Sequence, residues 1–122
     1  MLKTIIYGKY DIQSFSYDDS LKIVLTSDHM KKILNFGDRI VYTKFYEEEL
    51  ANKNNFIYYE LLKEKLCNIT MILDTESQLI KKIENDTGFF YSSKELKHYI
   101  IIAENYIMEI VTFNDVEETQ VL

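Results

Sequence analysis

The 122-residue sequence has no proline, no tryptophan, three glycines and a single cysteine. So little glycine and proline excludes collagen-like chains and proline-rich linkers. Cys67 has no second cysteine to pair with, so the disulfide framework of a small secreted domain is excluded and a reducing compartment is expected. The longest purely apolar run, residues 100–103, is far shorter than the roughly twenty residues of a transmembrane helix. We therefore expect a cytoplasmic protein without a membrane span.

Positive charge is also scarce. Fourteen Lys and Arg stand against twenty Asp and Glu, and the formal net charge is −6. The only arginine is Arg39, although arginine is the residue that reads guanine edges and phosphates in a bidentate manner. Because non-specific nucleic-acid affinity comes from basic side chains that displace counterions, we expect no direct binding to nucleic acid.

The composition is that of a folded domain. Hydrophobic residues make up 47% of the chain and charged residues 28%. A chain of this length buries roughly two-thirds of its surface on folding, which suffices for one core without a metal or a disulfide. We find no internal repeat and no linker. The sequence predicts one domain over residues 1–113, followed by an acidic, flexible tail over residues 114–122.

Alternating or β-branched segments predict most of the strands. They cover residues 1–7, 10–15, 21–26, 39–46, 69–73 and 89–91. Two further β-rich segments, residues 99–103 and 106–113, flank the short connection Glu104–Asn105. An asparagine in such a connection tolerates positive φ, so we expect a C-terminal β-hairpin there.

Three segments predict helices. Asp28 is a good N-cap for an apolar stripe that ends at Gly37, and residues 55–69 carry apolar side chains at helical spacing. Thr75 and Gln78 form a capping-box pattern that opens a helix ending near Gly88. The fold class predicted is therefore α+β, with a mainly antiparallel sheet, two or three helices and the C-terminal β-hairpin.

No catalytic or metal-binding signature accompanies these elements. The candidates for nucleophilic chemistry, Cys67, His29 and His98, are joined by no motif, and the isolated glycines form no phosphate loop. Two distant histidines and one cysteine match no zinc spacing. We expect His29 on the surface of a first helical turn and His98 at the start of a strand. The sequence thus predicts no catalytic residues, no metal and no cofactor.

Acidic residues cluster beside tyrosines at two places. Tyrosine is enriched in interface hot spots, and acidic rims steer basic partners. An equally simple reading is that these clusters are a solvated turn and the first turn of a helix, with core tyrosines beside them. The candidate partner-binding residues are Tyr17, Asp18, Asp19, Tyr46, Glu47, Glu48 and Glu49.

In size and charge the protein resembles bacterial immunity proteins, antitoxins and phage-encoded inhibitors. That resemblance implies a protein-binding inhibitor that is not an enzyme and that blocks the active or nucleic-acid-binding site of a basic toxin or nuclease. Two alternatives remain open. One is an assembly subunit that associates through an edge of the hairpin. The other is a small-molecule enzyme or ligand-binding domain, which would place His29 or His98 beside carboxylates and a pocket.

Overall fold

The computed structural model describes residues 2–47, 69–88 and 95–121, which form two antiparallel sheets and one helix. The five-stranded sheet consists, in spatial order, of β1 (Leu2–Tyr7), β6 (Ile69–Asp74), β7 (Lys97–Ile102), β8 (Tyr106–Thr112) and β5 (Ile40–Glu47). The four-stranded sheet consists of β2 (Asp11–Tyr17), β3 (Leu21–Thr26), β4 (Lys31–Asn35) and β9 (Glu117–Val121).

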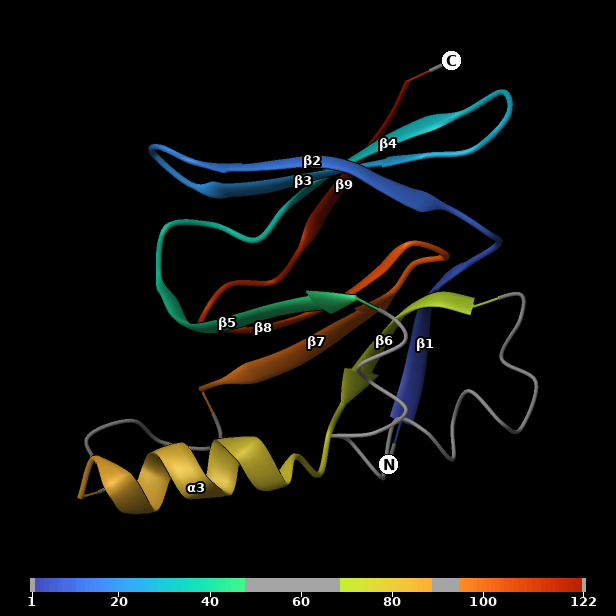
Figure 1. Ribbon diagram of the computed structural model, residues 1–122. Coiled ribbons are helices and arrows are strands. Elements are labelled where there is room, and N and C mark those ends of the chain that lie inside the picture. Colours follow the sequence, from blue (N-terminus) through green and yellow to red (C-terminus); the bar gives the residue numbers. More distant parts are fainter. Residues whose placement is uncertain (1, 48–68, 89–94, 122) are drawn as a thin grey trace.

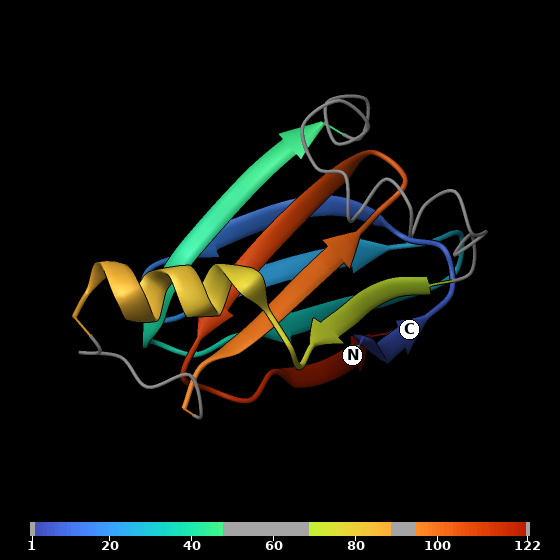
Figure 2. The same cartoon turned by 90° about the horizontal axis from the view of Figure 1, so that it is seen from below.

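The two sheets stack face to face, and the helix α3 (Gln78–Asp86) lies against the outer face of the five-stranded sheet (Figures 1 and 2). The core fills the space between the sheets. In β3, for example, Leu21, Ile23 and Leu25 alternate with more exposed residues and are almost completely buried. The period of two therefore directs one apolar face of each strand toward the other sheet.

The central strands β7 and β8 are buried on both faces. Tyr99 and Ile101 of β7 belong to the core between the sheets, whereas Ile100 belongs to a second cluster on the outer face. Beside that cluster, Ile80 of α3 packs with Val111 of β8. Strands covered on both sides need apolar residues at nearly every position, which explains the continuous run at residues 100–103.

The predicted fold class is wrong. The structure is mostly antiparallel sheet, strands account for 60% of it, and it has only one helix of seven residues or more among the described residues. The expected C-terminal hairpin is not found either. Strands β7 and β8 do pair, but they lie inside the five-stranded sheet and the chain continues into β9.

The segment predicted as the first helix is instead strand β4. Its apolar residues fit both periods, because Leu34 of β4 and Phe36, just after the strand, are two residues apart and both are completely buried. Pairing with β3 on one side and β9 on the other decides between the two readings. His29 is consequently an exposed residue of the β3–β4 turn rather than of a helix.

The structure also corrects where one predicted helix begins and what residues 117–121 form. The helix predicted from the Thr75 capping box exists, but it begins at Gln78 and its N-cap is Ser77. Residues 117–121, expected to belong to a flexible tail, form β9 and pair with β4. The helix predicted over residues 55–69 and the strand over residues 89–91 lie almost entirely outside the described residues.

One side chain links the edge strand β2 to the β7–β8 turn of the five-stranded sheet. Asn105, between β7 and β8, accepts a hydrogen bond from the Ile12 amide and donates one to the Ile12 carbonyl oxygen, each at 3.0 Å. The Glu104 amide donates to the Tyr10 carbonyl oxygen close by. These bonds hold the start of β2 over the β7–β8 turn.

Two connections between the sheets touch at Gly37 and Asn114. Gly37 follows β4 and has φ +86°, a conformation that residues with a Cβ rarely adopt. A Cβ on Gly37 would lie 2.3 Å from Asn114 Cγ and Oδ1. Asn114 in turn accepts a hydrogen bond from the Arg39 amide at 3.2 Å. The close approach therefore requires glycine for two reasons, backbone conformation and space.

We predict that Gly37→Ala lowers the free energy of unfolding by more than Gly88→Ala does. Gly88 also has positive φ, at +62°, but nothing lies within 4 Å of its added Cβ, so it serves as a matched control. The control should cost about 1–2 kcal/mol from backbone strain alone, and Gly37→Ala should exceed it. Urea denaturation measures both. Equal losses would contradict the steric role of Asn114.

Candidate functional site

The open edge formed by β2 and β5 carries a row of half-exposed aromatic rings. These are edge strands of different sheets, and β2 lies over β5 (Figure 1). The ring centroids of Phe15 and Phe45 are 5.1 Å apart, and those of Phe45 and Tyr106 are 4.6 Å apart. Phe15 is 49% exposed and Phe45 40%, so these rings are only partly buried in the core.

The row exists because of strand alternation. Phe15 and Tyr17 share the face of β2 that points toward the core, since they pair with the buried residues Ile23 and Leu21 of β3. Phe45 pairs with Met108 and therefore shares the inward face of β5. On edge strands an inward-facing ring is covered on one side only, which leaves the other side in solvent.

At one end of the row lies the predicted Asp18–Asp19 turn with Tyr17. The Tyr17 hydroxyl donates to the Asp38 carbonyl oxygen at 3.0 Å, and the residue remains 53% exposed. The Asp19 amide donates to Asp18 Oδ1 at 2.7 Å. This backbone hydrogen bond is the main reason that the pKa of Asp18 is lowered, so its carboxylate stays charged on the surface.

The described residues of the other predicted cluster, Tyr46 and Glu47, lie on opposite faces of β5. Glu47 is exposed, pairs with Tyr106 and shares the inward face of β5 with Phe45. Tyr46 points to the opposite face, where its hydroxyl donates to Glu109 Oε2 at 3.2 Å. Glu48 and Glu49 lie outside the described residues.

The structure thus places one part of each predicted cluster on the same edge but at opposite ends. Tyr17 contacts Asp38, just before β5, whereas Glu47 ends that strand, and eight strand residues span about 25 Å. We call this surface the acidic aromatic edge. It consists of Phe15, Tyr17, Asp18, Asp19, Phe45, Glu47 and Tyr106.

Sequence reasoning missed the aromatic centre of this surface. The i, i+2 spacing of Phe15 and Tyr17 signals one strand face, but it equally fits a buried face. Which strands lie at the edges of the two sheets decides the matter, and strand order is not readable from one sequence. Carboxylates around exposed aromatic faces form a surface suited to Lys and Arg side chains, through ion pairing and cation–π contacts.

By its fold the protein is a two-sheet antiparallel β-sandwich with a helix on one outer face. Comparison with family models, with curated proteins and with solved structures found no match to the chain. Within residues 2–47, 69–88 and 95–121, no helix is long and apolar enough to cross a membrane. The same ranges contain no group of three or more His, Cys, Asp or Glu residues placed to hold a metal ion.

We predict that the Asp18 carboxyl titrates below its ordinary pKa of 3.8 in the folded protein and returns to that value in urea. Because the folded pKa is depressed, the stabilising contribution is present above pH 3.8 and is lost as the pH falls through the folded pKa. NMR titration of the side-chain carboxyl carbon measures both values. A folded pKa at or above 3.8 would refute the proposed Asp18–Asp19 hydrogen bond.

Proposed function

We propose that this protein is a small inhibitor that binds a basic protein through the acidic aromatic edge and occludes that partner's active or nucleic-acid-binding site. A toxin nuclease neutralised by an immunity protein or antitoxin is the partner we favour. One observation carries the proposal. A row of partly exposed aromatic rings in mutual contact lies on an open sandwich edge that has carboxylates at both ends.

The aromatic row supplies the affinity in this proposal. Phe15, Tyr17 and Phe45 are among the few large hydrophobic residues of the described chain that are exposed. Rings held against one another lose little conformational freedom on binding, and such rigid aromatic anchors dominate interface energetics. Phe45 is held between Phe15 and Tyr106, so the row is already ordered in the free protein.

In this proposal the carboxylates orient the basic partner and raise the association rate. Asp18, Asp19 and Glu47 are exposed, and the chain as a whole carries a formal charge of −6. A negatively charged surface attracts a basic partner over about one Debye length and raises the association rate in a salt-dependent manner. A nuclease active site, which binds phosphates through Lys and Arg, has the complementary charge.

Assembly through an edge of β7 or β8, the strands predicted as a C-terminal hairpin, is not proposed. Strand β7 lies between β6 and β8, and β8 lies between β7 and β5. Neither strand has an unpaired side that a second copy could extend. The proposed activity belongs in the cytoplasm, because the single cysteine suits a reducing compartment.

We predict that a photoreactive phenylalanine analogue at Phe45 crosslinks one basic protein in lysate of the source cells, whereas the same analogue at Tyr7 does not. Tyr7 is 71% exposed but lies on β1, at the far edge of the five-stranded sheet. Mass spectrometry identifies the crosslinked partner. Equal crosslinking at both positions would argue against the acidic aromatic edge as the binding surface.

With that partner purified, Glu47→Lys should slow association about tenfold and flatten its dependence on salt. Glu117→Lys makes the same charge change at an exposed strand position on β9, at the edge of its sheet opposite β2, and should have a much smaller effect. Phe15→Ala should raise the dissociation rate about tenfold or more. Surface plasmon resonance at several salt concentrations measures these rates. If Glu47→Lys and Glu117→Lys act alike, the carboxylates do not steer binding.

A further inference from the structure

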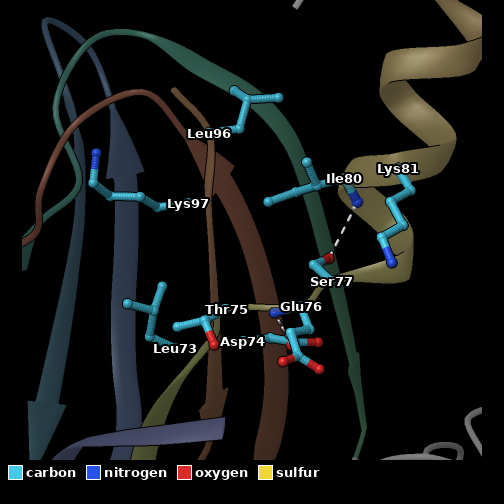
Figure 3. A pocket seen from close by; sticks show the side chains of 9 residues that line it. All are labelled: Leu73, Asp74, Thr75, Glu76, Ser77, Ile80, Lys81, Leu96 and Lys97. Atoms are coloured by element: carbon cyan, nitrogen blue, oxygen red, sulfur yellow. Dashed lines mark hydrogen bonds between the residues drawn. The ribbon is translucent and has the colours of Figure 1, made fainter. Parts of the chain in front are cut away.

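A cleft of about 410 Å³ lies at the beginning of α3, beside the end of β6 and the start of β7 (Figure 3). Its lining combines apolar side chains, two carboxylates and two lysines, which are Leu73, Ile80 and Leu96, Asp74 and Glu76, and Lys81 and Lys97. Ser77 lines the same cleft although only 5% of the residue is exposed. The cleft is lined by residues from the end of β6 to the first turns of α3 and from the start of β7, and none of these residues belongs to the acidic aromatic edge.

The Ser77 hydroxyl connects the cleft to a buried polar chain. Ser77 Oγ lies 2.7 Å from His98 Nδ1, and His98 Nε2 lies 3.0 Å from Glu109 Oε1. The Tyr46 hydroxyl donates to the other oxygen of the same carboxylate. His98 is 1% exposed and Glu109 4%. The hydrogen-bonded side chains therefore extend from the cleft into the interior beneath α3.

The hydrogen bonds around Ser77 determine which acceptor its hydroxyl proton points to. Ser77 Oγ already accepts the Ile80 amide proton at 3.1 Å, as the N-cap of α3 (Figure 3). With Nε2 protonated and donating to the Glu109 carboxylate, His98 Nδ1 is an acceptor, and the hydroxyl proton of Ser77 points to it. A serine, a histidine and a carboxylate in this order constitute an activated nucleophile with its base and its positioning group.

We propose that Ser77 is a nucleophile that captures activated acyl or organophosphorus electrophiles entering the cleft. Ser77 Oγ forms a bond to the electrophilic carbon or phosphorus, and the bond to the leaving group breaks. The leaving group departs as an anion with that electron pair. The hydroxyl proton moves to His98 Nδ1, and the Glu109 carboxylate stabilises the resulting imidazolium.

The start of α3 assists the same step. The first amides of a helix have no intrahelical partner, and the helix dipole favours negative charge there. In nucleophile turns between a strand and a helix, the amide of the residue after the nucleophile stabilises the oxyanion. Gln78 occupies that position here, directly after Ser77. The negative charge that develops on the electrophile's oxygen therefore forms next to a favourable dipole.

The burial of His98 also predicts where the reaction stops. A water that hydrolyses the adduct needs a base, but His98 is 1% exposed and, unlike Ser77, does not line the cleft. Water in the cleft thus has poor access to Nδ1, so the adduct accumulates instead of turning over. The inference is independent of the proposed inhibitor function, because it concerns a different face and requires no protein partner.

The test is labelling of the whole protein with a fluorophosphonate probe, followed by peptide mapping by mass spectrometry. We expect one adduct on Ser77, formed at least about 100-fold faster than on the exposed Ser27 of the β3–β4 turn. p-Nitrophenyl acetate should release about one equivalent of nitrophenol and then stop. An unlabelled Ser77, or labelling spread over exposed serines and tyrosines, would overturn the proposal.

Variants separate reactivity from folding. Ser77→Ala should abolish labelling and Ser27→Ala should leave it unchanged. Glu109→Gln retains a side-chain oxygen for His98 but removes the charge, so labelling should slow about tenfold or more in protein that circular dichroism shows to be folded. If Ser77→Ala fails to fold, the mapped adduct on the unmodified sequence and the Glu109→Gln rate still decide the matter. An unchanged labelling rate for Glu109→Gln would show that the hydrogen bonds from Ser77 through His98 to Glu109 serve only the structure and do not activate Ser77.

Discussion

The arrangement of this molecule depends on covering both faces of the β7–β8 pair. Nearly every residue of the two strands is buried, and the pair supplies side chains to the cores on both sides. The four-stranded sheet covers one face, and α3 packs against part of the other through Ile80. Apolar surface of this extent stabilises the fold only when it is removed from water on both sides. The remaining described elements are placed by that requirement.

Two buried ionisable residues interrupt the apolar pattern of this pair. His98 and Glu109 lie on the outer face, beneath α3, where an unpaired polar group would be costly. They bond to each other and to Ser77 and Tyr46, so the chain of contacts links two strands, the start of the helix and the end of β5. Such a chain fixes the position of α3 on the sheet more narrowly than apolar packing alone, because hydrogen bonds depend on direction.

Local patterns predicted most of the described strands but neither β4, β9 nor the overall fold. Segments 21–26 and 39–46 were recognised from alternation and β-branching, and β3 and β5 occupy them within a residue. The apolar residues around Leu34 fit two periods, and only pairing with β3 and β9 selects a strand. The acidic tyrosine clusters contain Tyr17 and Glu47, but the sequence could not place Phe15 and Phe45 between them without the strand order. The proximity of Ser77, His98 and Glu109 likewise depends on pairings between distant segments.

Asn105 has one more consequence, for the behaviour of the protein at high concentration. Edge strands expose unpaired amides and carbonyls that can template cross-β association between molecules. At Ile12 both backbone groups are already occupied by a single side-chain amide, and a register shift follows directly between Ile12 and Ser14. A foreign strand would meet a filled position and then an irregular backbone, so this stretch of the β2 edge resists fibrillar pairing. Deamidation of Asn105 would remove the donor, place a carboxylate near the Ile12 carbonyl oxygen and make this edge vulnerable as the protein ages.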